Sequence, residues 1–213
     1  RFTQDGIDIA SSGNNTVAGN WIGLNTAGTA AAGNQQGVNI WSANNNTVGG
    51  TTAADRNVIA GNTGPGMFVG GGSTGTHIYG NYIGTDKTGT VAIANQVAGV
   101  ELMSSGTTVG GTTSAYRNLI SGNTVGVAFY AGGSSNTVLG NYIGTDVTGS
   151  VALANVNYGV QINSDASYNV IGGTSAGARN LISGNTNYGV AIMDPGAVGN
   201  QVEGNWSGVN AAG

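Results

Sequence analysis

The chain has 213 residues with 41 Gly, 2 Pro and no Cys, and charged residues make up 7% of it, against about 25% in an average globular domain. Hydrophobic residues make up 39% and the net charge is −4, which excludes intrinsic disorder because a disordered chain combines low hydrophobicity with high net charge. Five Lys and Arg and a pI near 4.5 leave nucleic-acid binding without electrostatic support. No apolar run approaches the roughly 18 residues of a membrane span, so no membrane insertion is expected.

A repeat runs through the whole sequence. The motif Gly-Val-x-Ile, or a close variant, recurs every 27 to 33 residues, which indicates a solenoid of six full coils and a truncated seventh. It opens at Gly6, Gly37, Gly66, Gly99, Gly126, Gly159 and Gly189.

Each coil is expected to contain three short strands, because apolar and polar residues alternate between clusters of Gly, Asn, Ser and Thr. The first strand turns one apolar column inward, namely Ile7, Val38, Met67, Val100, Val127, Val160 and Val190. The residues that follow these face outward and are mostly polar or small, namely Asp8, Asn39, Phe68, Glu101, Ala128, Gln161 and Ala191. The second and third strands repeat the pattern around Val17 and Ile22. We therefore predict an all-β fold, a right-handed parallel β-helix with about seven coils of ~30 residues, forming one domain over residues 1–213.

Two kinds of coil alternate, so the repeating unit is a pair of coils. One kind carries Gly-Asn-Trp/Tyr-Ile-Gly followed by about ten extra residues, as in 80–84 and 85–94. The other carries Gly-Gly-Thr-Thr/Ser, about five extra residues and Arg-Asn-x-Ile, as in 110–120. Placing the long loops at different corners keeps them from colliding across a coil spacing of ~4.8 Å.

One Asn per coil recurs at a fixed corner and is expected to form a ladder of side-chain amide bonds from coil to coil. This structural column is Asn34, Asn62, Asn95, Asn123, Asn155 and Asn185. A second Asn column precedes the third strand, from Asn20 to Asn205.

Arg and Asp also recur at fixed places. Arg56, Arg117 and Arg179 are expected to donate to carbonyl groups of their own loops, and Asp86 and Asp146 to close turns. All five are interpreted as scaffold residues.

The motifs Gly-Asn-Tyr-Ile-Gly-Thr-Asp-x-Thr-Gly and Gly-Gly-Thr-Thr…Arg-Asn-Leu-Ile-Ser-Gly-Asn resemble those of parallel β-helix repeat proteins that bacteria secrete or display. The resemblance covers essentially the whole chain. It implies a pectate-lyase-like solenoid and an extracellular or cell-surface location, and it brings no catalytic residues with it.

Catalytic chemistry has little support in the sequence. On the outward column of the first strand, Asp8 and Glu101 lie three coils apart, roughly 14 Å, whereas a glycosidase needs carboxylates ~5–9.5 Å apart. His77 is the only His and replaces a Thr of an outward column. We expect no catalytic residue, no metal site and no cofactor.

The remaining hypotheses are binding and structural roles. Trp21, Tyr82, Tyr142 and Trp206 share one column and could stack on the sugars of an extended polysaccharide, unless the ten-residue loops cover them. An outward Thr column is typical of ice-binding solenoids, but His77 interrupts it.

The leading prediction is a non-catalytic extracellular rod or stalk with a structural or adhesive role. The sequence enters and leaves in mid-pattern, so the expected partners are flanking coils of the same chain or further copies stacked end to end into a filament. The alternative is a polysaccharide-binding module, or, less favoured, a polysaccharide-degrading one.

Overall fold

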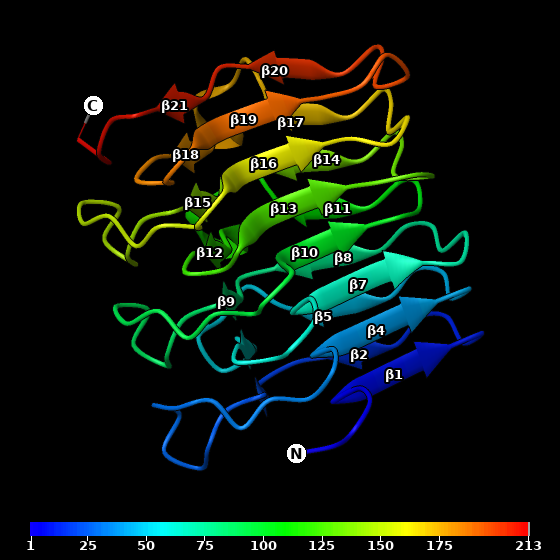
Figure 1. Ribbon diagram of the computed structural model, residues 1–213, viewed down its shortest axis with the longest axis vertical. Coiled ribbons are helices and arrows are strands. Elements are labelled where there is room, and N and C mark those ends of the chain that lie inside the picture. Colours follow the sequence, from blue (N-terminus) through cyan, green and yellow to red (C-terminus); the bar gives the residue numbers. More distant parts are fainter. Residues whose placement is uncertain (213) are drawn as a thin grey trace.

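The computed structural model describes residues 1–212 and consists of three parallel seven-stranded sheets wound into one rod (Figure 1). Sheet A contains β1 (Ile7–Ala10), β4 (Val38–Trp41), β7 (Met67–Gly70), β10 (Ala98–Leu102), β13 (Val125–Phe129), β16 (Tyr158–Ile162) and β19 (Tyr188–Ile192). Sheet B contains β2 (Thr16–Val17), β5 (Thr47–Gly49), β8 (His77–Tyr79), β11 (Thr108–Gly110), β14 (Thr137–Leu139), β17 (Val170–Gly172) and β20 (Gln201–Glu203). Sheet C contains β3 (Trp21–Ile22), β6 (Val58–Ile59), β9 (Tyr82–Ile83), β12 (Leu119–Ile120), β15 (Tyr142–Ile143), β18 (Leu181–Ile182) and β21 (Trp206–Ser207).

Every third strand returns to the same sheet, which confirms the predicted parallel β-helix. Coil 1 is β1–β3, coil 2 is β4–β6, and so on to coil 7, β19–β21. Strands pair in register, so that Val38 lies beside Ile7 and Met67 beside Val38. Because side chains alternate faces along a strand, this register stacks each sequence column directly above the last.

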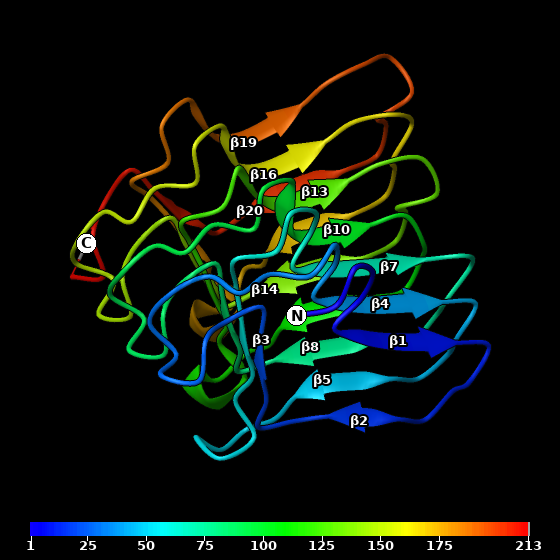
Figure 2. The same ribbon diagram turned by 60° about the horizontal axis from the view of Figure 1, so that its bottom comes forward.

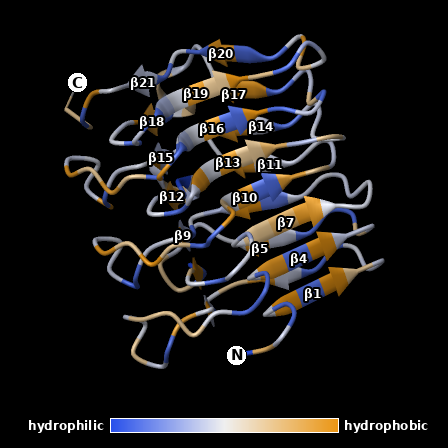
Figure 3. Ribbon diagram, viewed as in Figure 1, coloured by the Kyte–Doolittle hydropathy of each residue, from blue (hydrophilic) through white to orange (hydrophobic). Residues whose placement is uncertain are grey.

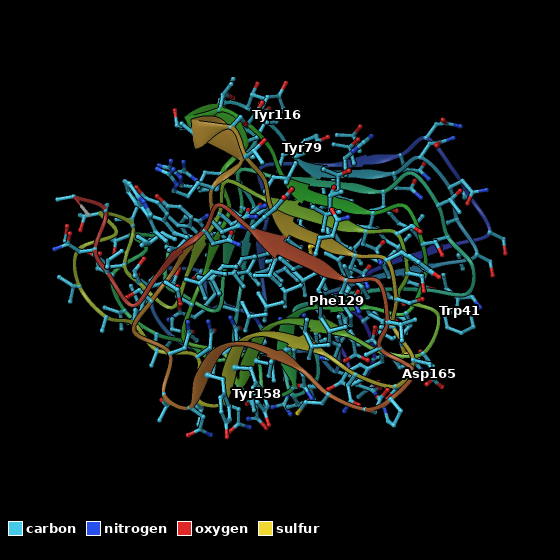
Figure 4. All side chains as sticks on the ribbon, turned by 90° about the horizontal axis from the view of Figure 1, so that it is seen from above. Trp41, Tyr79, Tyr116, Phe129, Tyr158 and Asp165 are labelled. Carbon is cyan, nitrogen blue, oxygen red and sulfur yellow. The ribbon has the colours of Figure 1, made fainter. Side chains whose placement is uncertain are left out.

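The inward columns form one continuous core inside the rod. Phe129, the largest fully buried side chain, points into the interior (Figure 4), and its register partners in the neighbouring coils are Leu102 and Ile162. Seen from outside, the strands of sheet A alternate between hydrophobic and hydrophilic residues (Figure 3). The predicted inward and outward assignments are therefore confirmed.

The long loops of the odd-numbered coils gather on one side of the rod (Figures 1 and 2). An isolated antiparallel β-bridge joins the two ends of each loop, such as Thr85–Ala92 in coil 3. They also bond to one another across two coils, since the amide of Lys87 donates to Gly28 and that of Val147 to Gly89. The loops thus form a layer of their own outside sheet C.

Both predicted Asn ladders are present and bridge successive coils through buried side chains. In the column from Asn34 to Asn185, each Nδ2 donates to the next Oδ1 at 2.8–3.3 Å. In the column from Asn20 to Asn205, the same bonds measure 2.9–3.1 Å. Each amide also holds a backbone group of the turn, as Asn118 Nδ2 does with the Ile78 carbonyl at 2.8 Å.

A third ladder, which the sequence analysis missed, precedes the strands of sheet B. It runs through Asn15, Asn46, Thr76, Thr107, Asn136, Asn169 and Asn200. The two Thr residues interrupt it, and the buried Asn46 Nδ2, Thr76 Oγ1 and Thr107 Oγ1 have no hydrogen-bond partner. A buried polar group without a partner costs about 1–3 kcal/mol, so the interruption is a weak point of the rod.

Helical structure is limited to two short 3₁₀ turns within residues 1–212, Ser114–Tyr116 and Ala176–Ala178. No helix within these residues is long enough and apolar enough to cross a bilayer.

Candidate functional site

The aromatic column considered from the sequence lies on the outer side of sheet C. Tyr82 is buried, with 9% of its surface exposed, and Tyr142 is partly buried. The loops cover these rings: a Cβ on Gly89 would lie 3.0 Å from the Tyr82 ring, and one on Gly149 would lie 2.8 Å from the Tyr142 ring. The loop-covered arrangement is therefore the one observed for Tyr82 and Tyr142, whereas Trp21 is 47% exposed.

The regular recurrence of Arg and aromatic residues along the chain is explained by contacts between them in the same layer. The guanidinium carbon of Arg117 lies 4.1 Å from the centre of the Tyr142 ring, and its Nε donates to the Gly140 carbonyl at 3.2 Å. Arg56 and Arg179 repeat both contacts with the next coil. The expectation that each Arg donates to a carbonyl of its own loop was wrong, because both the carbonyl and the ring that each Arg contacts belong to the following coil.

The four rings consequently do not form an open row. Arg56 lies against Tyr82, Arg117 against Tyr142 and Arg179 against Trp206, while Lys87 Nζ lies 5.3 Å from the Trp21 ring centre. In each of these contacts, a cationic side chain of the protein itself lies over a face of the ring.

A different group of aromatic side chains lies on the outer face of sheet A. We call it the aromatic band, and its members are Trp41, Phe68, Glu101, Tyr130, Tyr158, Gln161 and Tyr188. They come from coils 2 to 7 and from both ends of the strands, so the band crosses the sheet diagonally. Trp41 and Tyr188, at its two ends, are 49% and 58% exposed.

At one end of the band, the rings of Trp41 and Phe68 stack with centres 6.0 Å apart and planes 16° apart. Gly70 makes this possible, because a Cβ there would lie 2.5 Å from the Phe68 ring and 3.0 Å from the Trp41 ring. A larger residue in this outward position would separate the two rings.

At the other end, the rings of Tyr158 and Tyr188 stack with centres 5.5 Å apart and planes 12° apart. Tyr130 and Tyr158 pack over the small outward residues Ala98 and Ala128, which are fully buried as a result. The small side chains thus leave room for the tyrosine rings to lie over the strands.

Polar groups of coils 4 to 6 complete the band. Glu101 is in register with Phe68 on one side and Ala128 on the other, and burial raises the pKa of its carboxyl group above the ordinary value. The Tyr130 hydroxyl lies 3.5 Å from Gln161 Oε1. The pKa of Tyr130 is raised, first by burial and then by the charges of Glu101 and Tyr158.

The carboxylates of this face do not gather around Glu101. Asp8 accepts a hydrogen bond from Asn39 Nδ2 at 2.8 Å, and three coil steps of ~4.8 Å separate its strand from that of Glu101. Asp5 lies near Asp8, and its pKa is raised by burial and then by the Asp8 charge. Within residues 1–212, no three His, Cys, Asp or Glu side chains are grouped so that they could hold a metal ion.

The single His lies on the opposite side of the rod, on sheet B. Its Nδ1 is 2.7 Å from the Tyr79 hydroxyl, and Tyr79 meets Tyr116 edge to face with ring centres 4.8 Å apart. Figure 4 places Tyr79 and Tyr116 on one side and Tyr158 on the other. His77 therefore has no part in the aromatic band.

Only part of the band was predicted from the sequence. Phe68, Glu101 and Gln161 belong to the predicted outward column, whereas Trp41 and Tyr130 occupy the position two residues later, for which no prediction was made. The aromatic residues at that second position are the signal that could have revealed the site.

Comparison with known proteins adds little to this description. No protein-family model matches the chain, and no curated protein matches it. One solved structure, the crystal structure of a TibC-catalyzed hyper-glycosylated TibA fragment, is 14% identical over 98% of this chain and 100% of that chain, with a TM-score of 0.12. A TM-score this low supports no argument about fold or function.

Proposed function

We propose that the chain is a non-catalytic, adhesive β-helical rod that binds an extended polysaccharide along the aromatic band, outside a bacterial cell or on its surface. The observation that carries the proposal is the band itself, in which two stacked ring pairs flank Glu101 and Tyr130, and Gln161 lies on the strand of Tyr158. The location is supported by the resemblance of the coil motifs to those of secreted and surface β-helix proteins.

The chemistry of the band suits a sugar chain. A pyranose ring has an apolar face of C–H groups, which packs on aromatic rings, and a rim of hydroxyl groups, which bonds to amide, carboxyl and phenol oxygens. Trp41 and Tyr188 lie five coil steps apart, about 24 Å at ~4.8 Å per coil. A ligand that contacts both ends is therefore an elongated one.

A rigid support for such a ligand is consistent with the interior of the rod. Two uninterrupted Asn ladders and a continuous apolar core connect every coil to the next. Rigidity favours binding, because a surface that is already ordered loses little conformational entropy when the ligand binds.

We propose a non-catalytic role because the carboxylates on this face are not arranged for hydrolysis. Glu101 and Asp8 are three coils apart, and Asp8 is engaged by Asn39. Glycoside hydrolysis by the usual route needs two carboxyl groups ~5–9.5 Å apart, flanking the bond to be cleaved.

The test compares retention in gels that contain soluble polysaccharides, for the natural protein and for Trp41→Ala combined with Tyr188→Ala. We expect the double variant to bind roughly tenfold more weakly, about 1.4 kcal/mol, because the two most exposed rings of the band are lost. The control is Tyr168→Ala, since Tyr168 is also exposed but lies in the turn after β16. Unchanged retention of the double variant, or absence of retention of the natural protein on every polysaccharide, would contradict the proposal.

A further inference from the structure

We infer that the aromatic band selects neutral polysaccharides and discriminates against anionic ones such as polyuronates. This inference rests on the proposed function and names the class of ligand. It follows from where the few charges of the chain lie.

The cationic side chains are placed away from the band. Arg56, Arg117 and Arg179 pack against aromatic rings of sheet C, and Lys87 lies over Trp21 in the loop layer. The remaining Lys or Arg, Arg1, lines a hollow at coil 1 together with Ile7 of β1 and Trp21 of β3. The first four cations lie on sheet C or in the loop layer, a separate face from sheet A, and Arg1 lies at coil 1, outside the coils 2 to 7 that form the band. None of the five therefore lies within the band as a counter-charge for a carboxylate.

The acidic side chains, by contrast, lie on or beside the band. Glu101 is in its middle, and Asp5 and Asp8 lie at coil 1 of the same sheet. Asp165 and Asp194 follow strands β16 and β19 and therefore lie at the opposite edge of the sheet from Tyr158 and Tyr188, which begin these strands. Asp194 accepts hydrogen bonds there from the amides of Ser164 and Asp165. A chain lying along the band therefore meets negative charge beside its Trp41 end and at its centre.

Glu101 makes the largest contribution because it is the least exposed of these groups to screening by solvent. It is flanked by Phe68 and Ala128, and burial is what shifts its pKa upward. Like charges that are partly buried repel more strongly than exposed ones, since counterions screen them less. The other polar groups in the centre of the band, Tyr130 and Gln161, are uncharged and can bond to sugar hydroxyls.

The experiment uses pairs of polysaccharides with the same backbone and different charge. Hydroxyethyl cellulose is compared with carboxymethyl cellulose, and polygalacturonate with its carboxyl-reduced neutral form, in EDTA at pH 7 and low ionic strength. We expect the natural protein to bind the neutral member of a pair at least about tenfold more tightly, and the difference to shrink as salt is added.

Two matched variants test whether Glu101 causes the preference for neutral polysaccharides. Glu101→Gln and Glu203→Gln both remove one negative charge, but Glu203 lies on β20 of sheet B. We expect Glu101→Gln to reduce the neutral-to-anionic ratio severalfold and Glu203→Gln to leave it within about twofold.

The outcomes separate the inference from the proposed function. Equal or tighter binding of the anionic polysaccharides overturns the inference while the proposed function stands. An equal effect of the two Gln variants also overturns it, because selectivity would then come from net charge rather than from the band. If no member of either pair binds, both the proposed function and the inference fail.

Discussion

Asn46 and Thr76 occupy adjacent positions of the third ladder, and the ladder is broken between them. Asn46 Nδ2 and Thr76 Oγ1 are both buried without a hydrogen-bond partner, whereas Asn15 and Asn46 are bonded at 3.0 Å one coil earlier. Thr is too short to reach the amide of the coil below, so the column loses the bond that every Asn pair makes.

Thr76→Asn should repair this break and stabilise the protein. Its Oδ1 would accept from Asn46 Nδ2, and its Nδ2 would donate to Thr107 Oγ1, which also lacks a partner. We expect the free energy of unfolding to rise by about 1 kcal/mol, measured by chemical denaturation. Thr108→Asn, on the outward side of β11, should change it by less than about 0.5 kcal/mol. A loss of stability in Thr76→Asn would show that the corner has no room for the longer side chain.

Asn118→Ala should have the opposite effect. It removes bonds to Asn81, Asn141 and the Ile78 carbonyl, all buried, and leaves their partners unsatisfied. We expect a loss of about 3 kcal/mol or more, measured as a fall in the denaturation midpoint. Asn187→Ala is the control, because the bond from Asn187 to Asn157 is exposed and 3.4 Å long. A loss below about 1 kcal/mol for Asn118→Ala would mean that water replaces the ladder.

The Arg–aromatic contacts of sheet C should also be measurable. In a double-mutant cycle of Arg117→Ala and Tyr142→Leu, we expect a coupling energy of about 0.5–1 kcal/mol, typical of a cation over a ring near the surface. Arg117→Lys should lose part of it, since Lys keeps the charge but lacks the planar group that lies on the ring. A coupling energy of zero would show that Arg117 acts only through its bond to Gly140.

Acid should weaken the loop layer. Burial raises the pKa of Asp86, but hydrogen bonds from the Thr88 side chain and from the amides of Val91, Thr90 and Thr88 outweigh it, and the net pKa is below the model-peptide value. Asp146 has the same pattern. A lowered pKa stabilises the fold at pH values above the unfolded pKa, near ~3.9, and this contribution is lost as the pH falls through the lower folded value.

The measurement is the unfolding temperature between about pH 6 and pH 2 for the natural protein and for Asp86→Asn combined with Asp146→Asn. We expect a smaller decrease on acidification in the variant, because Asn does not titrate there. Asn25 shows that Asn can close this turn, since its Oδ1 accepts from the Thr29 and Ala30 amides at 2.9 and 3.3 Å. Identical pH profiles would mean that the two carboxyl groups do not contribute to acid stability.

Much of the fold could be predicted because every coil repeats the same residue types at the same places. Parallel strands in register stack like on like, so an apolar column must face the core and an Asn column must meet itself, as from Asn34 to Asn185. The third ladder could not be predicted because Thr76 and Thr107 break its column, and only the structure shows that the remaining Asn residues still bond in line.

The sequence by itself therefore determined the number of coils, the side of each strand that faces inward and the alternation of loops, since all of these follow from periodicity. Only the tertiary structure decided which side chains meet diagonally, such as Trp41 with Phe68 across Gly70 and Arg117 with Tyr142 of the next coil. The physical reason is that a repeat sets what lies directly above each residue, whereas contacts between columns depend on side-chain rotamers and on the gaps that glycines leave. In the aromatic band, the Trp41–Phe68 pair is a contact of that second kind, whereas Tyr158 and Tyr188 stack in register within one column.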